Sequence, residues 1–202
     1  MAKIKWRGGA LLAPAPAALV TCGDMEHSNA LTVAWTGIIN TVPPQTYISV
    51  RPGRHSYKMI KESGEFVINL TSADMIKAVD GCGMLTGAKV DKFAKFGLVK
   101  EQASEVACPL VAQSPLSLEC RVTDVIELGS HHMFLADVVA VDVEEKLIDQ
   151  NGKLRLDKAN LAAFAHGEYF ALGKKIGDFG FSVRKKKKPV HKAPHKEKGE
   201  SK

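Results

Sequence analysis

Short segments rich in β-branched and aromatic residues, separated by turns, restrict this chain to a mainly β fold. Residues 30–39 and 46–50 are two such segments, and residues 42–45 between them read Val-Pro-Pro-Gln, which favours a turn over a strand or a helix. We therefore expect two neighbouring strands here. Residues 17–22 and 65–70 have a similar composition and are expected to form further strands.

Two longer segments, residues 117–128 and 133–143, show partial alternation of apolar and polar side chains. Residues 129–132, Gly-Ser-His-His, join them, so the pattern predicts a long antiparallel hairpin. The helical patterns are too short and too irregularly placed to alternate with the strands, which disfavours a doubly wound parallel sheet. An antiparallel barrel with short helices fits best. The expected helical segments are residues 56–63, 73–81, 91–96 and 158–164.

The basic residues are concentrated at the C-terminal end. The chain has 202 residues and a net charge of +6, and residues 184–202 contain nine lysines or arginines but two glutamates. Residues 1–183 are therefore close to neutral, and we expect them to form one domain followed by a basic, disordered tail. A function in binding nucleic acid or an acidic surface would depend on this tail.

No apolar segment is long enough to span a membrane as a helix, since Pro14 and Pro16 interrupt the most apolar stretch, residues 8–20. The same prolines, with Thr21 before Cys22, argue against a lipoprotein export signal. The four cysteines lack the spacing of a zinc site or a thioredoxin motif. We expect reduced thiols and a cytoplasmic location.

Motifs of several common enzyme classes are missing from the sequence. No Ser-His-Asp order, nucleophile elbow, Walker loop or paired metal-type carboxylates occur, so hydrolase, NTPase and metalloenzyme functions have no support. Residues 80–87, Asp-Gly-Cys-Gly-Met-Leu-Thr-Gly, are glycine-rich, but the glycine spacing differs from that of a dinucleotide-binding loop and no apolar helix follows. We expect a flexible turn there.

Residues 51–56, Arg-Pro-Gly-Arg-His-Ser, lie between a predicted strand and the predicted helix that Ser56 would cap. Two guanidinium groups, a hydroxyl and the free N–H groups of a helix start would converge at this point. The combination predicts an anion site, most simply for a phosphate. The alternative is a pair of solvated loop arginines beside a capping serine.

Asn29, Thr32 and Trp35 are spaced three residues apart where a loop enters the strand predicted at residues 30–39. They would offer hydrogen bonds and an aromatic face to a ligand, or they are ordinary strand residues with a core tryptophan. His131 is expected at the tip of the predicted hairpin, where it is either a site residue or a surface histidine.

Five motifs follow one another along the chain: residues 29–35 (NALTVAW), 49–56 (SVRPGRHS), 66–70 (FVINL), 91–93 (DKF) and 129–131 (GSH). In this order and spacing the sequence resembles the flavin reductase-like FMN-binding split-barrel family over about residues 10–184. The resemblance implies a six-stranded antiparallel Greek-key barrel that forms a homodimer and holds FMN near the dimer interface.

The resemblance also implies which residues bind the cofactor. The first motif would line the flavin ring, the second would bind the phosphate, and the others would lie near the ring and the ribityl chain. The implied FMN-binding residues are Asn29, Thr32, Val33, Ala34, Trp35, Ser49, Val50, Arg51, Arg54, His55, Ser56, Asn69, Leu70, Lys92, Phe93 and Phe164.

His131 is the implied catalytic residue. Related flavin reductases carry a Gly-Asp-His motif associated with the nicotinamide, and this chain has Ser130 in place of the aspartate. The replacement concerns the use of NAD(P)H more than the binding of FMN. The resemblance implies an FMN-dependent oxidoreductase that either takes hydride from NAD(P)H or carries electrons for a redox partner protein. Binding of nucleic acid or an acidic surface through the basic tail is the alternative.

Overall fold

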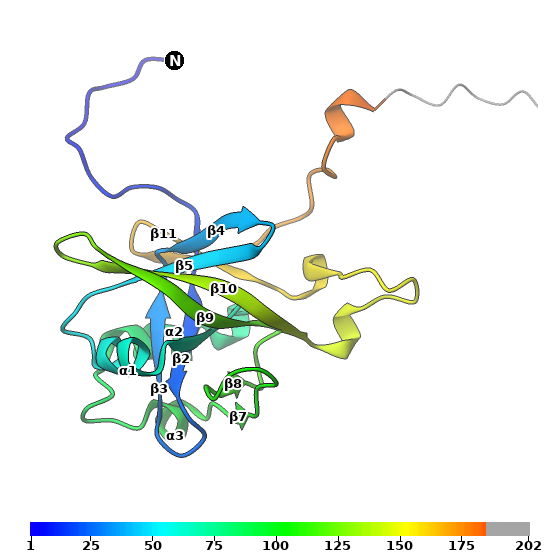
Figure 1. Cartoon of the computed structure of the whole chain (residues 1–202). Helices are drawn as coiled ribbons and strands as arrows, with labels where there is room; N and C mark the ends of the chain where they lie inside the picture. Colours follow the sequence, from blue (N-terminus) through cyan, green and yellow to red (C-terminus); the bar gives the residue numbers. More distant parts are fainter. Residues whose placement is uncertain (185–202) are drawn as a thin grey trace, which may run out of the picture.

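The computed structural model describes residues 1–184 and is built around one antiparallel sheet (Figure 1). Its seven strands have the order β3-β2-β6-β9-β10-β5-β4. The predicted mainly β fold is confirmed, with seven strands in this sheet in place of the expected six. The strands are β2 (Ala18–Gly23), β3 (Ser28–Val33), β4 (Thr36–Thr41), β5 (Pro44–Val50), β6 (Glu65–Asn69), β9 (Leu116–Glu127) and β10 (His132–Val143).

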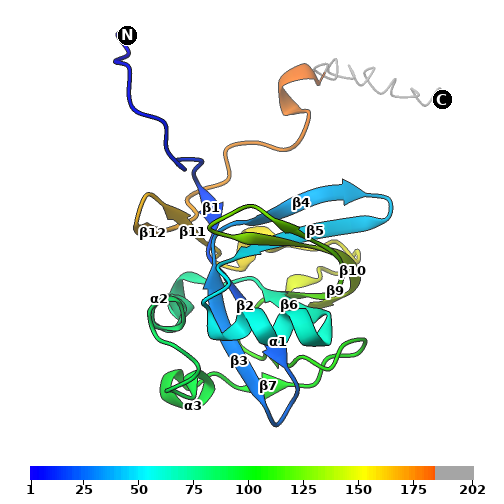
Figure 2. The same ribbon diagram turned by 60° about the vertical axis from the view of Figure 1, so that its left-hand side comes forward.

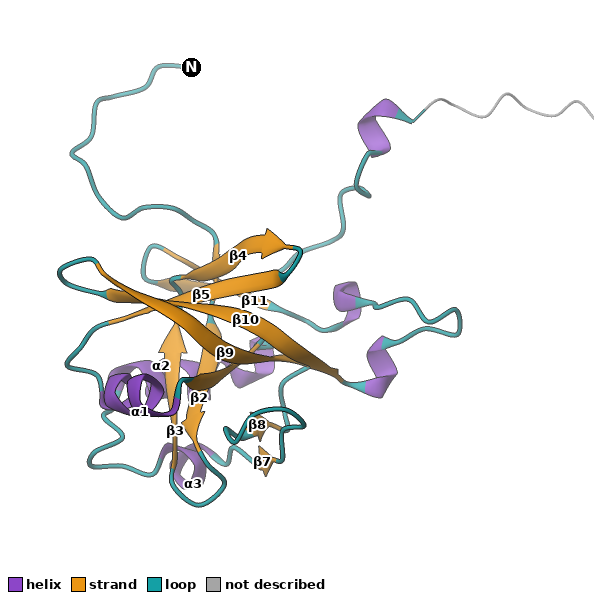
Figure 3. Cartoon of the chain, in the orientation of Figure 1, coloured by secondary structure: helices purple, strands orange, loops and turns teal. Residues whose placement is uncertain are grey.

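Shorter elements surround the sheet, as Figure 3 shows by colour. The α-helices of the described residues are α1 (His55–Ser63), α2 (Ile76–Met84) and α3 (Lys92–Phe96). A three-stranded sheet joins β1 (Ala15–Pro16), β11 (Ala162–Ala165) and β12 (Glu168–Ala171), and β7 (Lys100–Glu101) pairs with β8 (Leu110–Val111). The 3-10 helices are η1 (Ala73–Met75), η2 (Glu145–Leu147), η3 (Leu156–Lys158) and η4 (Phe181–Val183).

Two hydrophobic cores lie on opposite faces of β2. On one face, Val20 packs with Phe134 of β10 and with Ile60 of α1, which lies against β2 and β3 in Figure 2. On the other face, Leu19 packs with Val79 of α2. Because successive side chains of a strand point to opposite faces, a strand between two cores is buried on both faces, and its one polar side chain, Thr21, donates to the carbonyl of Pro109. This explains why the sequence of β2 shows no alternation.

The single strand predicted at residues 30–39 is wrong. The chain forms β3, which pairs with β2, and then β4, which pairs with β5. Ala34 and Trp35 lie between the two pairings, because the chain must leave one neighbour before it can reach the other. Trp35 is 44% exposed, so it is not a core tryptophan.

Two further predictions of secondary structure are wrong, one of a helical turn and one of a flexible turn. The helical turn expected at residues 158–164 ends at Lys158, Asn160 has a left-handed φ of 50°, and β11 follows. The flexible turn expected at residues 80–87 is helical as far as Met84. Gly81 is required inside this helix because a Cβ atom there would collide with the ring of Phe96.

The described residues contain no helix of the length and hydropathy needed to cross a bilayer. Arg184 is the last described residue, so nearly all of the predicted basic tail lies outside the described residues. A domain boundary at residues 183 and 184 stays a prediction.

Candidate functional site

A cavity of about 420 Å³ opens beside the segment that leads from β3 to β4. Its volume is typical of small-molecule sites. We call it the charged cavity, because two arginines contribute to its wall. Its lining residues are Leu31, Thr32, Val33, Ala34, Trp35, Ser49, Val50, Arg51, Arg54, His131 and Phe164.

The two arginines are positioned by the connection between β5 and α1. β5 ends at Val50, and Arg54 is the N-cap residue of α1. The N–H of Arg54 bonds the carbonyl of Arg51 at 3.0 Å, which closes the turn. The guanidinium of Arg54 donates to the carbonyl of Gly83 at 3.0 Å, in the last turn of α2, where the helix dipole favours a cation. The positive groups of this connection therefore face one cavity.

The predicted capping role of Ser56 is wrong. Ser56 lies inside the first turn of α1 and is fully buried, and its Oγ accepts a hydrogen bond from Nδ2 of Asn29 at 2.7 Å. The Ser56 side chain points toward the core because the inner face of α1 packs on the sheet. Asn29 and Ser56 therefore connect β3 to α1 behind the cavity wall.

Lys92 makes a second connection behind the wall. Its buried Nζ donates to the carbonyl of Ala30 at 2.7 Å and to that of Cys82 at 2.8 Å, which joins β3 to the end of α2. Burial lowers the pKa of the Lys92 ammonium, because removal from water disfavours its charged form.

His131 is brought to the cavity by the predicted hairpin of β9 and β10, which is confirmed. The turn begins at Gly129, whose φ of 84° favours glycine. The imidazole lies edge-on to the indole of Trp35, with 4.3 Å between ring centroids. Arg51 Nε donates to His131 Nε2 over 3.4 Å, and His131 Nδ1 lies 3.0 Å from Oγ of Ser130.

The contact with Arg51 favours one tautomer of His131. A guanidinium can only donate, so Nε2 accepts and the ring hydrogen lies on Nδ1, which faces the Ser130 hydroxyl. Partial burial, followed by the charges of Arg51 and Arg54, lowers the pKa of His131 and so favours the neutral imidazole.

A second cavity, of about 590 Å³, adjoins the charged cavity at the Trp35–His131 pair. It shares Ala34, Trp35, Ser49 and His131 with the charged cavity. We call it the neutral cavity, because none of its lining residues is lysine, arginine, aspartate or glutamate. Its lining residues are Gly9, Ala10, Leu11, Leu12, Pro14, Ala15, Pro16, Ala34, Trp35, Thr36, Tyr47, Ser49, Leu128, Ser130 and His131.

The structure brings ten of the predicted site residues to the charged cavity and leaves seven outside both cavities. Asn69 is fully buried and joins strands, donating to the carbonyl of Leu19 and accepting from the N–H of Val111. Phe93 belongs to the second core. Leu31 was missed, since an apolar strand residue gives no site signal. The seven outside are Asn29, His55, Ser56, Asn69, Leu70, Lys92 and Phe93.

A sequence profile described as "Flavin reductase like domain" matches residues 11–172. The chain is 30% identical to an uncharacterized protein of Archaeoglobus fulgidus over 117 residues, which are 58% of this chain and 66% of that protein. It is 23% identical to the FMN reductase (NADH) RutF of Enterobacter cloacae over 99 residues, 49% of this chain and 58% of that protein. Each match therefore covers less than two thirds of the relative's own length.

Solved structures match over more of their length. The flavoredoxin of Desulfovibrio vulgaris is similar with a TM-score of 0.83 and 29% identity, covering 90% of this chain and 99% of that one. The flavoredoxin of Methanosarcina acetivorans has a TM-score of 0.81 and 25% identity, covering 90% and 97%. The predicted resemblance to the family is confirmed, and the two flavoredoxins are similar to this chain over 90% of its length. The comparisons give no support to a nucleic-acid-binding alternative.

Proposed function

The chain belongs to the flavin reductase-like domain family, and on this basis we propose that it is an FMN-dependent oxidoreductase whose cofactor site is the charged cavity. One observation carries the assignment to this cavity: Arg51 and Arg54 line it together with the aromatic ring of Trp35. FMN combines a phosphate with a flat aromatic ring, so both parts find suitable partners. When bound, FMN supplies the electron or hydride transfer itself.

The guanidinium groups of Arg51 and Arg54, which line the cavity, fit the phosphate of such a cofactor. The positive end of the α1 dipole follows directly at His55 and favours an anion beside these arginines. We propose that the two guanidinium groups bind the phosphate. A direct contact of the phosphate with His55 stays a prediction. The Ser56 hydroxyl contributes indirectly, by fixing Asn29.

We assign the flavin ring to the segment between β3 and β4. Ala34 lies outside both strand pairings, so its backbone groups are placed to meet the polar edge of the ring, beside Thr32 and Val33. The indole of Trp35 and the ring of Phe164 provide aromatic contacts. Ser49 and Val50, at the end of β5, complete this wall.

The predicted residues behind the wall receive supporting roles in this proposal. Lys92 holds β3 against α2, which fixes the position of the wall relative to the arginines. Asn69, Leu70 and Phe93 support the same strands from the core side. A direct contact of these residues with the cofactor stays a prediction.

Our proposal for the electron donor rests on the chemistry around His131. The Enterobacter relative is named as an NADH-dependent FMN reductase. In this chain, however, Ser130 replaces the expected aspartate, and partial burial with the charges of Arg51 and Arg54 lowers the pKa of His131, which disfavours a positive charge on its ring. We therefore favour an electron carrier that serves a redox partner protein over a reductase that uses NAD(P)H.

We further propose a cytoplasmic homodimer that forms along β4. This edge strand exposes Ile38 by 68% and Ile39 by 47%, and an unpaired edge with apolar side chains favours pairing with another chain. Because β4 follows Trp35 directly, a second copy at this edge would lie near the charged cavity. All four cysteines are free, which agrees with a reducing compartment.

The visible absorption spectrum of the purified protein, mixed with FMN and desalted, tests this function. We expect flavin bands that remain after anaerobic addition of NADH and then NADPH, and that bleach with dithionite. Rapid bleaching by either nucleotide would identify a flavin reductase in place of a carrier. Loss of all flavin on desalting, with no saturable FMN binding, would contradict the proposed cofactor.

A further inference from the structure

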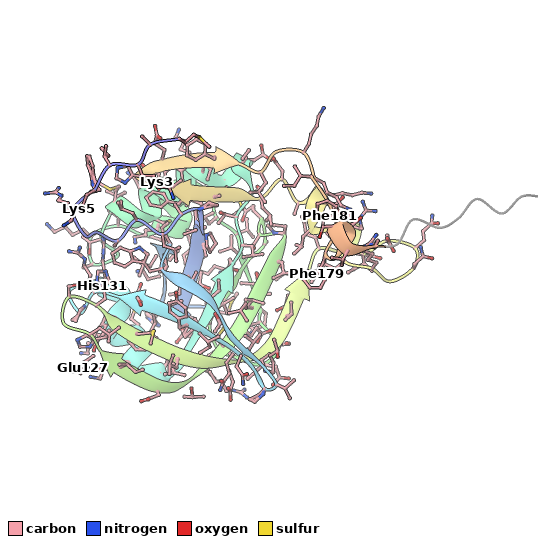
Figure 4. All side chains as sticks on the ribbon, turned by 90° about the horizontal axis from the view of Figure 1, so that it is seen from above. Lys3, Lys5, Glu127, His131, Phe179 and Phe181 are labelled. Atoms are coloured by element: carbon pink, nitrogen blue, oxygen red, sulfur yellow. The ribbon has the colours of Figure 1, made fainter. Side chains whose placement is uncertain are left out.

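We propose that Glu119 of β9 and Asp142 of β10 share one proton, and that this proton latches the connection between β7 and β8 onto the sheet. The latch is closed in mildly acidic solution and loosens as the pH rises. The β7–β8 connection comprises residues 102–109. The two carboxyl groups lie toward the end of the β9–β10 hairpin that is opposite to its tip, where Figure 4 labels Glu127 and His131. The latch therefore lies apart from the charged cavity and does not depend on FMN.

One buried carboxylate anchors the connection. Glu119 is fully buried, and its Oε1 accepts from the N–H and the hydroxyl of Ser104 at 2.8 and 2.7 Å. Its Oε2 accepts from the N–H groups of Glu105 and Val106 at 2.7 and 2.9 Å. The connection forms no helix or strand, so the carboxylate replaces the partners that regular structure would give these N–H groups. Hydrogen bonds to a carboxylate are stronger than those to a neutral acceptor.

The second carboxyl group has a buried oxygen without a partner. Asp142 Oδ2 is buried and receives no hydrogen bond from the described residues. Ser117, which lies opposite Asp142 in the strand pairing, donates instead to Oδ1 of Asn69 at 2.8 Å. An ionised oxygen in this place would be costly, whereas a protonated carboxyl can donate to Glu119, its hydrogen-bonded neighbour on the same face of the sheet. A shared proton thus gives the buried oxygen a partner.

The charges around Asp142 are almost all negative. Asp142 lines a cavity of about 370 Å³ that has no lysine, arginine or histidine in its lining. The other acidic residues of the lining are Glu101, Glu144 and Glu145. The basic residues nearby are already paired, Lys146 with Glu144 at 2.9 Å and Arg121 with Glu65 at 3.5 Å. Two neighbouring carboxylates without a compensating cation repel each other, so one of them retains a proton.

The proton belongs to Asp142. Burial, followed by the neighbouring Glu119, raises the pKa of Asp142 to about 6. Burial also opposes ionisation of Glu119, but the hydrogen bonds from Ser104 and Glu105 outweigh it and lower the pKa of Glu119. A group whose pKa is raised in the closed state stabilises that state at low pH, and this stability is lost as the pH rises through the raised pKa. The latch therefore loosens between mildly acidic and neutral pH.

Opening of the latch has a defined structural consequence. The connection covers a third hydrophobic core, in which Val106 and Cys108 pack with Val67 of β6. When the Glu119 carboxylate no longer holds residues 104–106, their N–H groups become accessible to water. Local opening of this kind is measured by hydrogen exchange.

Hydrogen exchange of the FMN-loaded full chain, followed by mass spectrometry at about pH 5 and about pH 8, tests the latch. After correction for intrinsic exchange rates, protection of residues 104–106 should fall about tenfold from the lower to the higher pH. This is the change expected for a carboxyl group whose pKa is raised from 3.8 to about 6 in the closed state. Helix α2, which packs in the second core, serves as the internal reference and should keep its protection.

Asp142→Asn and Glu145→Gln form a matched pair of variants. Asp142→Asn keeps the shape of the side chain, and its amide can donate to Glu119 at every pH. Protection of residues 104–106 should then no longer change between the two pH values. Glu145→Gln removes an acid from the same cavity without removing the shared proton, so it should leave the tenfold change intact. Glu145 is exposed and asparagine has the shape of aspartate, so both variants are expected to fold.

Several results would overturn the latch. These are equal protection of the wild type at both pH values, a pH dependence that persists in Asp142→Asn, or one that Glu145→Gln abolishes. NMR titration of the carboxyl carbons in the wild type is a check that needs no variant. Absence of a carboxyl group that titrates near pH 6 would also overturn it.

The latch and the proposed function fail separately. Hydrogen exchange of the cofactor-free protein should show the same pH dependence, since neither carboxyl group lines the charged cavity. If FMN does not bind, the proposed function fails, and the test of the latch remains valid.

Discussion

The charged and the neutral cavity share one aromatic wall but differ in how they can recognise a ligand. The charged cavity has Arg51 and Arg54 from the short connection between β5 and α1. The neutral cavity has no charged lining residue, and its far wall comes from the N-terminal segment. Electrostatic attraction therefore dominates on one side of the Trp35–His131 pair, and removal of apolar surface from water dominates on the other. Substitutions that add or remove a charge should therefore affect the charged cavity and the neutral cavity differently.

The largest expected effect is on FMN binding in the double variant Arg51→Ala/Arg54→Ala. Each charge-assisted contact with a phosphate contributes about 1.5 to 3 kcal/mol, and we take the lower end because both side chains are exposed. The FMN dissociation constant should therefore rise about a hundredfold. Fluorescence titration of FMN measures this constant.

The control for this variant is Lys58→Ala, which removes an exposed cation on α1 that pairs with Glu62. It should leave FMN binding unchanged. An unaltered dissociation constant in the double variant would place the phosphate elsewhere.

Ser130→Asp should have the next largest effect, because it puts a charge at the boundary of the two cavities. The carboxylate would accept from His131 Nδ1 and stabilise the imidazolium, raising the pKa of His131 by about one unit. NMR titration of the imidazole measures this pKa.

Ser130→Ala is the matched control for this charge effect, since it removes the hydroxyl without adding a carboxylate. It should leave the pKa of His131 below that in the aspartate variant. Equal titration of His131 in both variants would show that Ser130 does not face the ring as described.

Ionic strength should have a smaller effect, which acts through the charged cavity. Raising the ionic strength from about 0.05 to about 0.5 M screens exposed charges and should weaken FMN binding about fivefold. Fluorescence titration of FMN at both salt concentrations provides the measurement, and an unchanged dissociation constant would contradict a phosphate bound by the exposed arginines.

The smallest expected effect is the change in the pKa of His131 when Arg51 is replaced. In the wild type, His131 should titrate below its usual pKa, because partial burial and then Arg51 and Arg54 oppose its protonation. Arg51→Ala removes the nearer charge and should raise this pKa by a few tenths of a unit. Lys58→Ala again serves as the control in the NMR titration. A fall in the pKa of His131 on loss of Arg51 would contradict the hydrogen bond between them.

Local sequence patterns predicted the elements whose structure depends on neighbouring residues. Alternating side chains and a Gly-Ser-His-His turn were sufficient for the hairpin of β9 and β10, because a turn fixes its own strands. The same patterns failed at residues 80–84, where a helix accommodates Gly81 against Phe96 of another element. They also failed at Asn160, whose left-handed φ ends a pattern that otherwise looks helical.

In the candidate site, too, the features set by neighbouring residues were predictable and those set by distant residues were not. The arginines of residues 51–56 were predictable, since a strand end and a helix start lie within a few residues of each other. The burial of Ser56 was not, because it depends on Asn29, 27 positions away. The neutral cavity had no signal in the sequence, because the N-terminal segment that closes it carries no motif.

By itself, the sequence determined a mainly β chain, two arginines at a helix start, and the family motifs that contain them. The tertiary structure alone decided that Trp35 contacts His131, that burial and the charges of Arg51 and Arg54 lower the pKa of this imidazole, and that one cavity is charged while its neighbour is not. The physical reason is the distance along the chain over which each kind of interaction acts. Turn, capping and periodicity preferences act between neighbours in the chain, whereas the charge and solvation of a cavity depend on residues that only folding brings together.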